Sequence, residues 1–597
     1  MATSPSANSD GPFRATVKAG GKTIPDTVQL LSARVFKAVN RVPRAEIVLR
    51  DGDMSSGEFA VSESDSYKPG AAISIEAGYG DSTALVFSGI VIGQQLAIGG
   101  DNLCTVTLEC RDKSAALTVG RKNANYVDKK DSDIAGKLIG AVSGLTAQAT
   151  ATATQWKELV QYYCTDWDFL LARAEANGYV VIADDATVSF AAPKTDAAAA
   201  LTVTYGSDLL EFQAKLDARD QFASVQATAW DIKNQKIAQA KATPATVNAQ
   251  GDLAAADLAR ALNIGTFGLQ TAVTLESADL TTWAKAQQLK SGLARIRGSM
   301  KFQGSALAKV GAIIEVAGVG KRFNGKVYVS GITHEIGDGA WFTRAEFGLP
   351  PAWYAESGDL EAPAAAGLVP GVEGLQIGVV KKLSADPDGQ FKIQVSIPVM
   401  QAETDGVWAR LMQFHATSGQ GAFFVPEVGD EVVLGYFNND PSAPVILGSL
   451  YSSKRKTRYP IADEKNNTKA ITTRSGLTIE YDDDKKVITV VTPGKNKIVI
   501  SDDDKSILLQ DQHDNKLKMN DGGISLDSPK DITLKAQGNI SLTATGKVQI
   551  KATQDATMDG LNVTHTAQIG FTGKGSATAE LSASGQTTVK GAMVMIN

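Results

Sequence analysis

The feature that most constrains the fold is a short repeat near the C-terminal end of the sequence. An apolar residue recurs every eight positions and a second follows two places after each, in the pairs Ile532 and Leu534, Ile540 and Leu542, and Val548 and Ile550. Met558 continues the second series, and Gly538 and Gly546 keep the same period. A fixed period of this kind indicates stacked copies of one small unit.

A single chain cannot build a core from this repeat. After about Lys454 large apolar residues become sparse, and Thr, Ser, Lys, Asp and Gly dominate. The strands of one chain would also leave their edges unpaired in water. Three chains wound about one axis solve both problems, because the alternate apolar residues then lie centrally and every strand edge is paired. The sequence therefore predicts a stiff homotrimeric rod, an intertwined β-helix or β-prism.

A second β pattern leads into the repeat. Its alternating segments are residues 477–481, 487–491, 498–500 and 507–509. Such alternation, with turns between, predicts consecutive meander strands. The intervening aspartates, as at 482–484 and 502–504, carry oxygen atoms that suit calcium. Neither run has the glycine and terminal glutamate of an EF-hand loop, so solvated turns are the simpler interpretation.

Upstream of the rod, a Pro- and Ala-rich stretch from 350 to 374 is typical of an extended linker and marks a domain boundary. Five or so short strands follow between Ile377 and Leu450, which suits a small barrel of the OB type. The alternation at 391–397 is the most regular of them.

The N-terminal part is predicted to be one α+β unit. Alternating apolar residues at 45–50, 72–76 and 106–109 indicate a barrel or sandwich up to about Gly120. The other predicted elements are helices at 131–140, 166–178 and about 282–295, and strands at 179–182, about 211–230 and 313–348. In the second helix, Asp166 is expected to cap the N-terminus and Gly178 to end the helix.

Charge and hydropathy exclude several functions. Lys and Arg number 59 against 65 Asp and Glu, so no basic excess is available for the phosphates of a nucleic acid. The start has no signal-peptide pattern, and no stretch approaches the roughly 20 apolar residues that span a bilayer. We therefore expect synthesis in the cytoplasm.

Residues that bind metals or carry covalent chemistry are few and scattered. The three cysteines, expected to be buried reduced thiols, are Cys104, Cys110 and Cys164. The four histidines, no two of them close in sequence, are His334, His415, His513 and His565. No Gly-rich phosphate-binding loop is present either. The sequence predicts no metal site, no cofactor and no catalytic residues.

Several motifs resemble one protein family along nearly the whole chain. The stretch QYYCTDWDFLLARAEANGY at 161–179 is similar to a helix motif of the phage late-control protein D and VgrG hub domain. The segments KIQVSIP, VWAR, FVPEVGDEVVLGYF and DPSAPVILGSLY, at 392–398, 407–410, 424–437 and 440–451, resemble the OB-fold of phage cell-puncturing needles and VgrG spikes. This second resemblance is the more specific.

The resemblance implies a fold and an organisation. It places a hub with two related β-barrels and helices at 1–355, a linker at 356–374, the OB barrel at 375–455 and the trimeric spike at 456–597. The expected fold class is mainly β with an α+β hub. The implied role is a structural spike and baseplate hub of a phage-tail-like contractile injection system, which joins the inner tube to a membrane-piercing tip.

The resemblance also implies partners. A PAAR-repeat tip protein would sit on the blunt C-terminal end, where the candidate contacts are Met593, Val594, Met595, Ile596 and Asn597. The same residues are equally able to close the trimer core. Inner-tube and baseplate proteins, effector cargo and a target membrane complete the implied set. Assembly into a particle would follow synthesis, whether that particle is cytoplasmic, envelope-anchored or released.

Two other classes of function remain as alternatives. A cell-wall hydrolase needs paired carboxylates in a folded cleft, and the barrel runs into the rod without room for such a domain. A trimeric adhesin would bind cells through its tip without a tube or sheath. The sequence fits a phage tail, a type VI apparatus and an extracellular contractile particle equally well.

Overall fold

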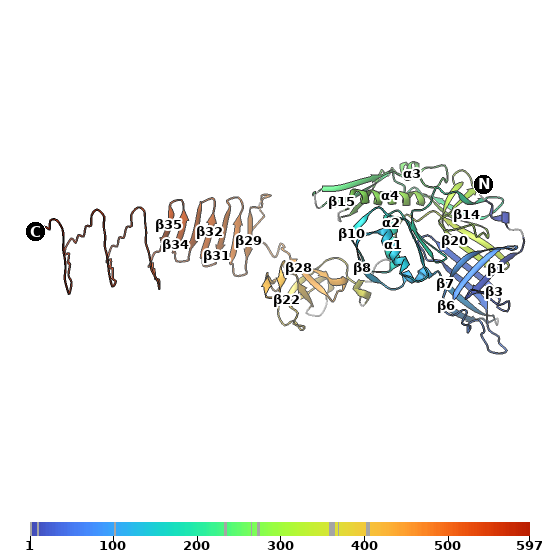
Figure 1. Cartoon of the computed structure of the whole chain (residues 1–597), viewed down its shortest axis with the longest axis horizontal. Coiled ribbons are helices and arrows are strands. Elements are labelled where there is room, and N and C mark those ends of the chain that lie inside the picture. Colours follow the sequence, from blue (N-terminus) through green and yellow to red (C-terminus); the bar gives the residue numbers. More distant parts are fainter. Residues whose placement is uncertain are drawn as a thin grey trace. The chain divides into compact units, whose positions relative to one another are not determined.

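The computed structural model describes residues 3–8, 11–100, 103–231, 234, 236–263, 265–271, 275–356, 364–367, 369, 371–401, 406–461 and 463–596. The chain is mainly β and separates into two compact units, Met1–Leu450 and Tyr451–Asn597 (Figure 1). Each unit is described by itself.

One continuous sheet of thirteen strands dominates the first unit. Its strands are β1 (Phe13–Ala19), β2 (Lys22–Thr23), β3 (Leu30–Ala38), β4 (Arg44–Arg50), β5 (Ala72–Tyr79), β6 (Ser82–Ile98), β7 (Cys104–Arg111), β13 (Ala199–Thr204), β14 (Leu209–Leu216), β18 (Ile296–Gln303), β19 (Ile313–Ala317), β20 (Gly325–Gly337) and β21 (Ala340–Phe347). The main path runs β14-β18-β21-β20-β3-β4-β7-β6-β5-β1-β2, and β19 joins β13 to β20.

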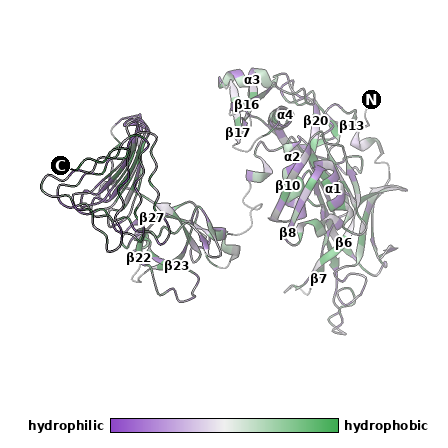
Figure 2. Cartoon of the chain, turned by 60° about the vertical axis from the view of Figure 1, so that its left-hand side comes forward, coloured by the Kyte–Doolittle hydropathy of each residue, from purple (hydrophilic) through white to green (hydrophobic). Residues whose placement is uncertain are grey.

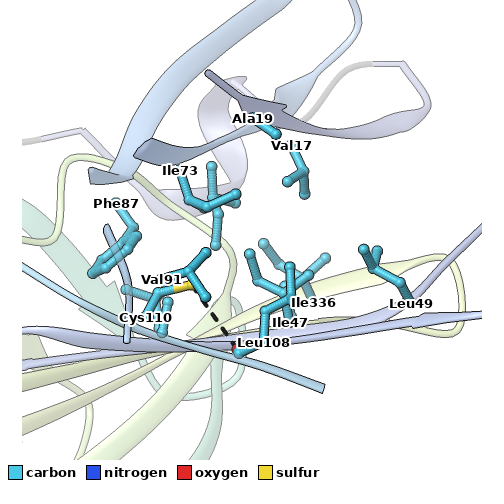
Figure 3. Close-up of a cluster of buried hydrophobic side chains, with 14 of the residues drawn as sticks. Val17, Ala19, Ile47, Leu49, Ile73, Phe87, Val91, Leu108, Cys110 and Ile336 are labelled. Atoms are coloured by element: carbon cyan, nitrogen blue, oxygen red, sulfur yellow. Dashed lines mark hydrogen bonds between the residues drawn. The ribbon is translucent and has the colours of Figure 1, made fainter. Parts of the chain in front are cut away.

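The sheet encloses two separate cores because β20 is shared between them. The first half of β20 pairs with β19, and its second half pairs with β3, with Gly331 opposite Ala38. The first core gathers side chains from β1, β4, β5, β6 and β7, including Ile47 and Phe87 (Figure 3). The second gathers β13, β18, β19, β20 and β21 around Met300 and Phe302. The hub therefore has one continuous sheet with two cores, and the two related barrels expected from the resemblance stay a prediction.

Among the described residues, three small sheets and four α-helices complete this part of the unit. The smaller strands are β8 (Lys122–Lys130) with β10 (Gln155–Cys164); β9 (Thr146–Ala149), β11 (Val180–Asp184) and β12 (Thr187–Ala191); and β15 (Ser224–Asp231), β16 (Lys236–Ala242) and β17 (Thr266–Thr271). The helices are α1 (Asp131–Gly140), α2 (Asp166–Ala176), α3 (Ala255–Ala261) and α4 (Ser277–Ala294). The helices predicted from sequence at 131–140 and 166–178 are confirmed, and α4 begins five residues before the predicted 282.

The predicted N-cap of α2 is wrong by one residue. The hydroxyl of Thr165 accepts the Asp168 backbone N–H at 3.0 Å, so Thr165 is the cap. Asp166 is instead buried. Its carboxylate accepts a hydrogen bond from the Gln161 side chain at 3.0 Å and forms an ion pair with Lys122. Sequence spacing did not distinguish the two residues, because both Thr and Asp favour the cap.

The cysteine prediction holds for one residue of three. Cys110 is buried in the first core, and burial, with the nearby Glu109 carboxylate, raises the pKa of its thiol to about 12. Cys104 and Cys164 are only half-buried, although neither forms a disulfide.

The predicted linker is partly anchored to the hub. Short 3-10 turns occupy Tyr354–Glu356 and Ala364–Gly367. The Tyr354 hydroxyl donates to Asp168 at 2.8 Å, and the Trp353 ring packs over the Lys290 ammonium at 5.5 Å. Residues 357–363, 368 and 370 of this segment lie outside the described residues.

The predicted OB-type barrel is confirmed. Five strands close in the order β22-β23-β24-β28-β27. They are β22 (Gln376–Lys382), β23 (Lys392–Ser396), β24 (Val407–Leu411), β27 (Glu431–Tyr436) and β28 (Pro444–Ser449), with a small hairpin of β25 (Ala416–Thr417) and β26 (Gln420–Gly421). Alternate residues such as Ile393 and Val395 of β23 point into a buried apolar core, which explains the regular pattern in the sequence.

His334 makes hub stability depend on pH. Its imidazole is buried, and Nδ1 accepts the Trp341 indole N–H at 3.3 Å and lies 3.1 Å from the Thr343 hydroxyl. Burial disfavours the charged form, and the Lys37 ammonium adds repulsion, so the pKa of His334 falls to about 3. The folded state therefore holds a neutral histidine over most of the acidic range.

We predict that the hub loses stability on acidification below pH 6.5. There the unfolded chain binds a proton that folded His334 cannot take, so this residue lowers the free energy of unfolding by about 1.4 kcal/mol per pH unit down to pH 3. Tryptophan-fluorescence denaturation at several pH values should show a shallower acid dependence for His334→Gln. The exposed control His415→Gln should keep the wild-type slope. Equal slopes for the two variants would contradict the assignment.

Candidate functional site

The C-terminal unit begins with a seven-stranded antiparallel sheet in strict sequence order. Its strands are β29 (Thr468–Thr472), β30 (Thr478–Asp482), β31 (Val487–Val491), β32 (Lys497–Ser501), β33 (Ser506–Gln510), β34 (Lys516–Asn520) and β35 (Gly523–Asp527). The four predicted meander strands are confirmed as β30 to β33. The other three strands, β29, β34 and β35, were not predicted, because their apolar residues are fewer or are interrupted by lysine.

Strand register places the apolar residues of this sheet in two rows on one face. Directly opposed residues of an antiparallel pair share a face of the sheet. The first row is Ile471, Ile479, Val490, Ile498, Leu509, Leu517 and Leu526. The second row is Tyr481, Ile488, Ile500, Ile507, Met519 and Ile524. We call these thirteen residues the apolar face.

The apolar face is largely exposed in the single chain. Ile498 and Ile500, at its centre, expose 43% and 44% of their surface. A groove of about 620 Å³ runs along the first row and reaches Ile532, the first residue of the eight-residue repeat. Figure 2 shows hydrophobic and hydrophilic residues alternating along these stacked strands. An apolar surface this long needs a covering partner in water.

The opposite face mixes polar residues with Val487, Val491, Val499 and Leu508, and the turns between the strands are polar. The Asp482 carboxylate accepts the backbone N–H groups of Asp484 and Lys485, both at 3.1 Å. The side chain of Asn515 and nearby backbone N–H groups lower the pKa of Asp511. These aspartates therefore shape turns between strands. The described residues contain no group of three or more His, Cys, Asp or Glu placed to hold a metal ion.

The eight-residue repeat gives a regular backbone without internal pairing. Beyond β35 the described chain contains no further strand up to residue 596. Successive bends lie eight residues apart, except for one step of seven between 561 and 568. The bends begin at 529, 537, 545, 553, 561, 568, 576, 584 and 592. The rising and falling trace is visible at the C-terminal end of Figure 1. The period therefore extends well past Met558, where the apolar signal in the sequence fades.

The repeat exposes its apolar residues as fully as the sheet does. Ile540 and Leu542 are 55% and 72% exposed, and the other repeat residues are similar. Of the predicted tip residues, Met593, Val594 and Met595 are exposed, and Ile596 is exposed to 92%. Asn597 lies outside the described residues. These side chains are exposed in the single chain, as both predicted uses require: contact with a PAAR-repeat protein and closure of the trimer core.

Among the described helices, none is both long and apolar enough to cross a lipid bilayer.

Comparison with known proteins finds a family match for each of the two parts of the first unit, the hub and the barrel. Residues 376–451, which form the closed barrel, match the type VI secretion system/phage-baseplate injector OB domain. Residues 9–338, more than half of the chain, match the Alg8 N-terminal domain. The chain therefore carries the OB domain of type VI and phage-baseplate injectors behind an Alg8-type N-terminal domain. The chain belongs to the Alg8 N-terminal domain family.

Similarity to individual relatives is local. The type VI secretion system spike protein VgrG3 of Vibrio cholerae is 35% identical over 66 residues, which are 11% of this chain and 6% of the relative. The spike protein VgrG1c of Pseudomonas aeruginosa is 24% identical over 137 residues, 21% of this chain and 19% of the relative. The chain thus spans less than a fifth of the length of these relatives.

Solved structures match a larger share of the chain, at low sequence identity and low TM-score. A type VI secretion component of E. coli, described as similar to phage T4 tail proteins, is 13% identical, with a TM-score of 0.36 over 73% of this chain and 99% of that one. The 43 kDa tail protein of prophage MuSo2 from Shewanella oneidensis is 11% identical, with a TM-score of 0.45 over 57% and 99%.

We predict that one charge on the apolar face prevents threefold association. Ile498→Lys would bring three ammonium groups together in an apolar interior, where each unpaired charge costs several kcal/mol. Sedimentation velocity of the full chain should show a loss of trimer. The control Thr489→Lys places the same side chain on the other face, opposite Glu480, and should leave the trimer intact. If the Ile498→Lys variant formed a trimer as resistant to heat as the wild type, the role of the apolar face in association would be contradicted.

Proposed function

We propose that the protein is the trimeric central spike and hub of a contractile injection system. The observation that carries the proposal is the apolar face of β29 to β35, continued by the exposed repeat. Burying each large apolar side chain stabilises an assembly by about 1.5–3 kcal/mol. These side chains are already partly covered in the single chain, so each would add only part of that free energy, but thirteen of them per chain together favour association.

Threefold association also explains the unpaired repeat. Residues 529–596 have a regular spacing but no hydrogen-bonded neighbour strand within one chain. In an intertwined rod, each short segment would pair with segments of the other two copies, which forms the predicted β-helix or β-prism. Because every strand would be held by other chains, none could peel away alone under load. This mechanical property suits a needle that is pushed through an envelope.

The proposed domain roles follow the predicted boundaries. The hub at 1–355 would meet the inner tube and baseplate, the linker at 356–374 would join it to the barrel at 375–455, and the rod at 456–597 would carry the tip. The relatives VgrG3 and VgrG1c are named as spike proteins. Their names support a structural rather than an enzymatic role for this chain. Delivery of effector cargo and contact with a target membrane belong to the same proposal.

The mass of the intact chain in solution tests the proposal most directly. Light scattering should give about three times 62.7 kDa for purified protein. Threefold association is expected because three intertwined copies would cover the apolar face and pair the repeat at once. A stable monomer would remove the intertwined rod and, with it, the proposed function.

The exposed terminus provides a second test. We predict that deleting residues 593–597 spares the trimer, because the apolar face and most repeats remain, but abolishes binding to a PAAR-repeat protein. Removal of residues 561–565 by comparison interrupts the repeat without touching the tip, and is expected to weaken the rod. Pull-down of a PAAR-repeat protein and light scattering separate the two effects. Unchanged binding after the terminal deletion would place the cap contact elsewhere.

A further inference from the structure

The hub contains a basic, partly apolar groove that the proposed function does not use. The groove has a volume of about 1110 Å³ and lies among β3, β6, α2 and α4. Its apolar lining includes Phe36, Ile90 and Trp167. We call it the basic groove because four cations line it: Arg41, Arg44, Arg111 and Lys113.

None of these four cations forms an ion pair with a residue that the structure describes. The Arg44 guanidinium packs over the Phe36 ring at 5.1 Å. A fifth cation at the groove, Lys290, is paired with Glu175, which is the one acid among the described lining residues. The groove therefore keeps an uncompensated positive charge beside an apolar surface. Its ligand should be acidic and carry an apolar side chain.

The same chain presents a segment with this chemistry. Residues 51–66, which we call the acidic loop, contain five acids and no Lys or Arg. Asp53, Glu58 and Glu63 are exposed and have no ion pair among the described residues. Between them, Met54 exposes 72% of its surface. An exposed methionine flanked by carboxylates complements an apolar groove flanked by cations.

The acidic loop is held in one shape, which lowers the entropic cost of docking. Asp53 and Glu58 are bridged, with the Asp53 N–H donating to the Glu58 carbonyl at 2.9 Å. The Asp53 carboxylate accepts the Ser55 backbone N–H at 2.9 Å. At the base of the loop, buried Asp51 accepts the backbone N–H groups of Val61 and Ser62 at 2.9 and 2.8 Å.

We infer that the acidic loop of one copy docks in the basic groove of the next copy, and so closes the hub into a ring. The inference rests on the proposed trimer. A ring needs a heterologous interface, in which each subunit offers one surface to the preceding copy and a different one to the following copy. The loop and the groove form such a pair of unlike surfaces. Charge complementarity selects a second copy as the occupant of the groove.

Site-specific cross-linking of the full chain tests this contact. A photoreactive p-benzoylphenylalanine in place of Met54 should join two chains on irradiation, with the cross-link mapped to the groove at residues 36–44 or 111–119. Samples are fully denatured before electrophoresis so that only covalent products remain. A cross-link within one chain, a cross-link to another part of a second copy, or no cross-link between copies would overturn the inference.

Charge reversal sharpens the test. Arg41→Glu with Arg44→Glu should lower cross-linking about tenfold, because repulsion replaces attraction across the interface. Adding Asp53→Arg and Glu58→Arg to the same chain should restore it. The control pair Lys22→Glu and Lys236→Glu makes the same change of charge at exposed sites outside the groove, and should leave cross-linking unchanged. Docking would be contradicted if the reversed charges at Arg41 and Arg44 left cross-linking unchanged. It would also be contradicted if the added reversal at Asp53 and Glu58 did not restore cross-linking.

Light scattering of the same variants separates this inference from the proposed function. With the rod intact, the reversed variant should remain trimeric by mass while its hubs no longer cross-link. A trimer without any loop-to-groove cross-link in the wild-type background would overturn the docking alone. A monomeric wild-type protein would overturn the proposed trimer as well.

Discussion

The structure depends on apolar side chains that have no partner within their own chain. In most domains a sheet is covered by a second layer of the same polypeptide. Here the row through Ile498 runs along seven strands and the row through Ile500 along six, and both remain open on one side. Hydrophobic burial is the dominant favourable term in folding, so an open face of this length makes the folded state of one chain incomplete. The constraint accounts for the proposed assembly and for the mechanical role that follows from it.

The two units of the chain differ in how they bury their apolar side chains. In the hub, the shared strand β20 lets one sheet close around two cores, so large side chains such as Phe87 and Phe302 are fully buried. In the C-terminal unit, each strand is short and antiparallel to its neighbour, and every contact between strands is local in sequence. This meander does not fold back to cover itself. The hub buries its large apolar side chains within one chain, whereas the C-terminal unit leaves its apolar face exposed.

Sequence reasoning worked best where the side-chain period reports directly on burial. The alternation at 391–397 predicted β23, and the meander segments predicted β30 to β33, because period-two patterns reflect the pleat of a strand. It worked less well where two residues have equivalent chemistry. Thr165 and Asp166 both suit a helix cap, and only the hydrogen bond to Asp168 distinguishes them. Half-burial of Cys104 and Cys164 was also beyond sequence, since it depends on neighbours distant along the chain.

The sequence alone determined the OB-type barrel, the meander strands β30 to β33 and the eight-residue period, because composition and period are properties of the chain itself. The rod and its need for other copies stay predictions. Only the tertiary structure showed that strand register aligns the apolar residues of seven strands into two rows. It also showed that the bends continue to 592, and that the cations at 41, 44, 111 and 113 line one groove. These features depend on which distant residues meet in space, and a linear pattern carries no record of such contacts.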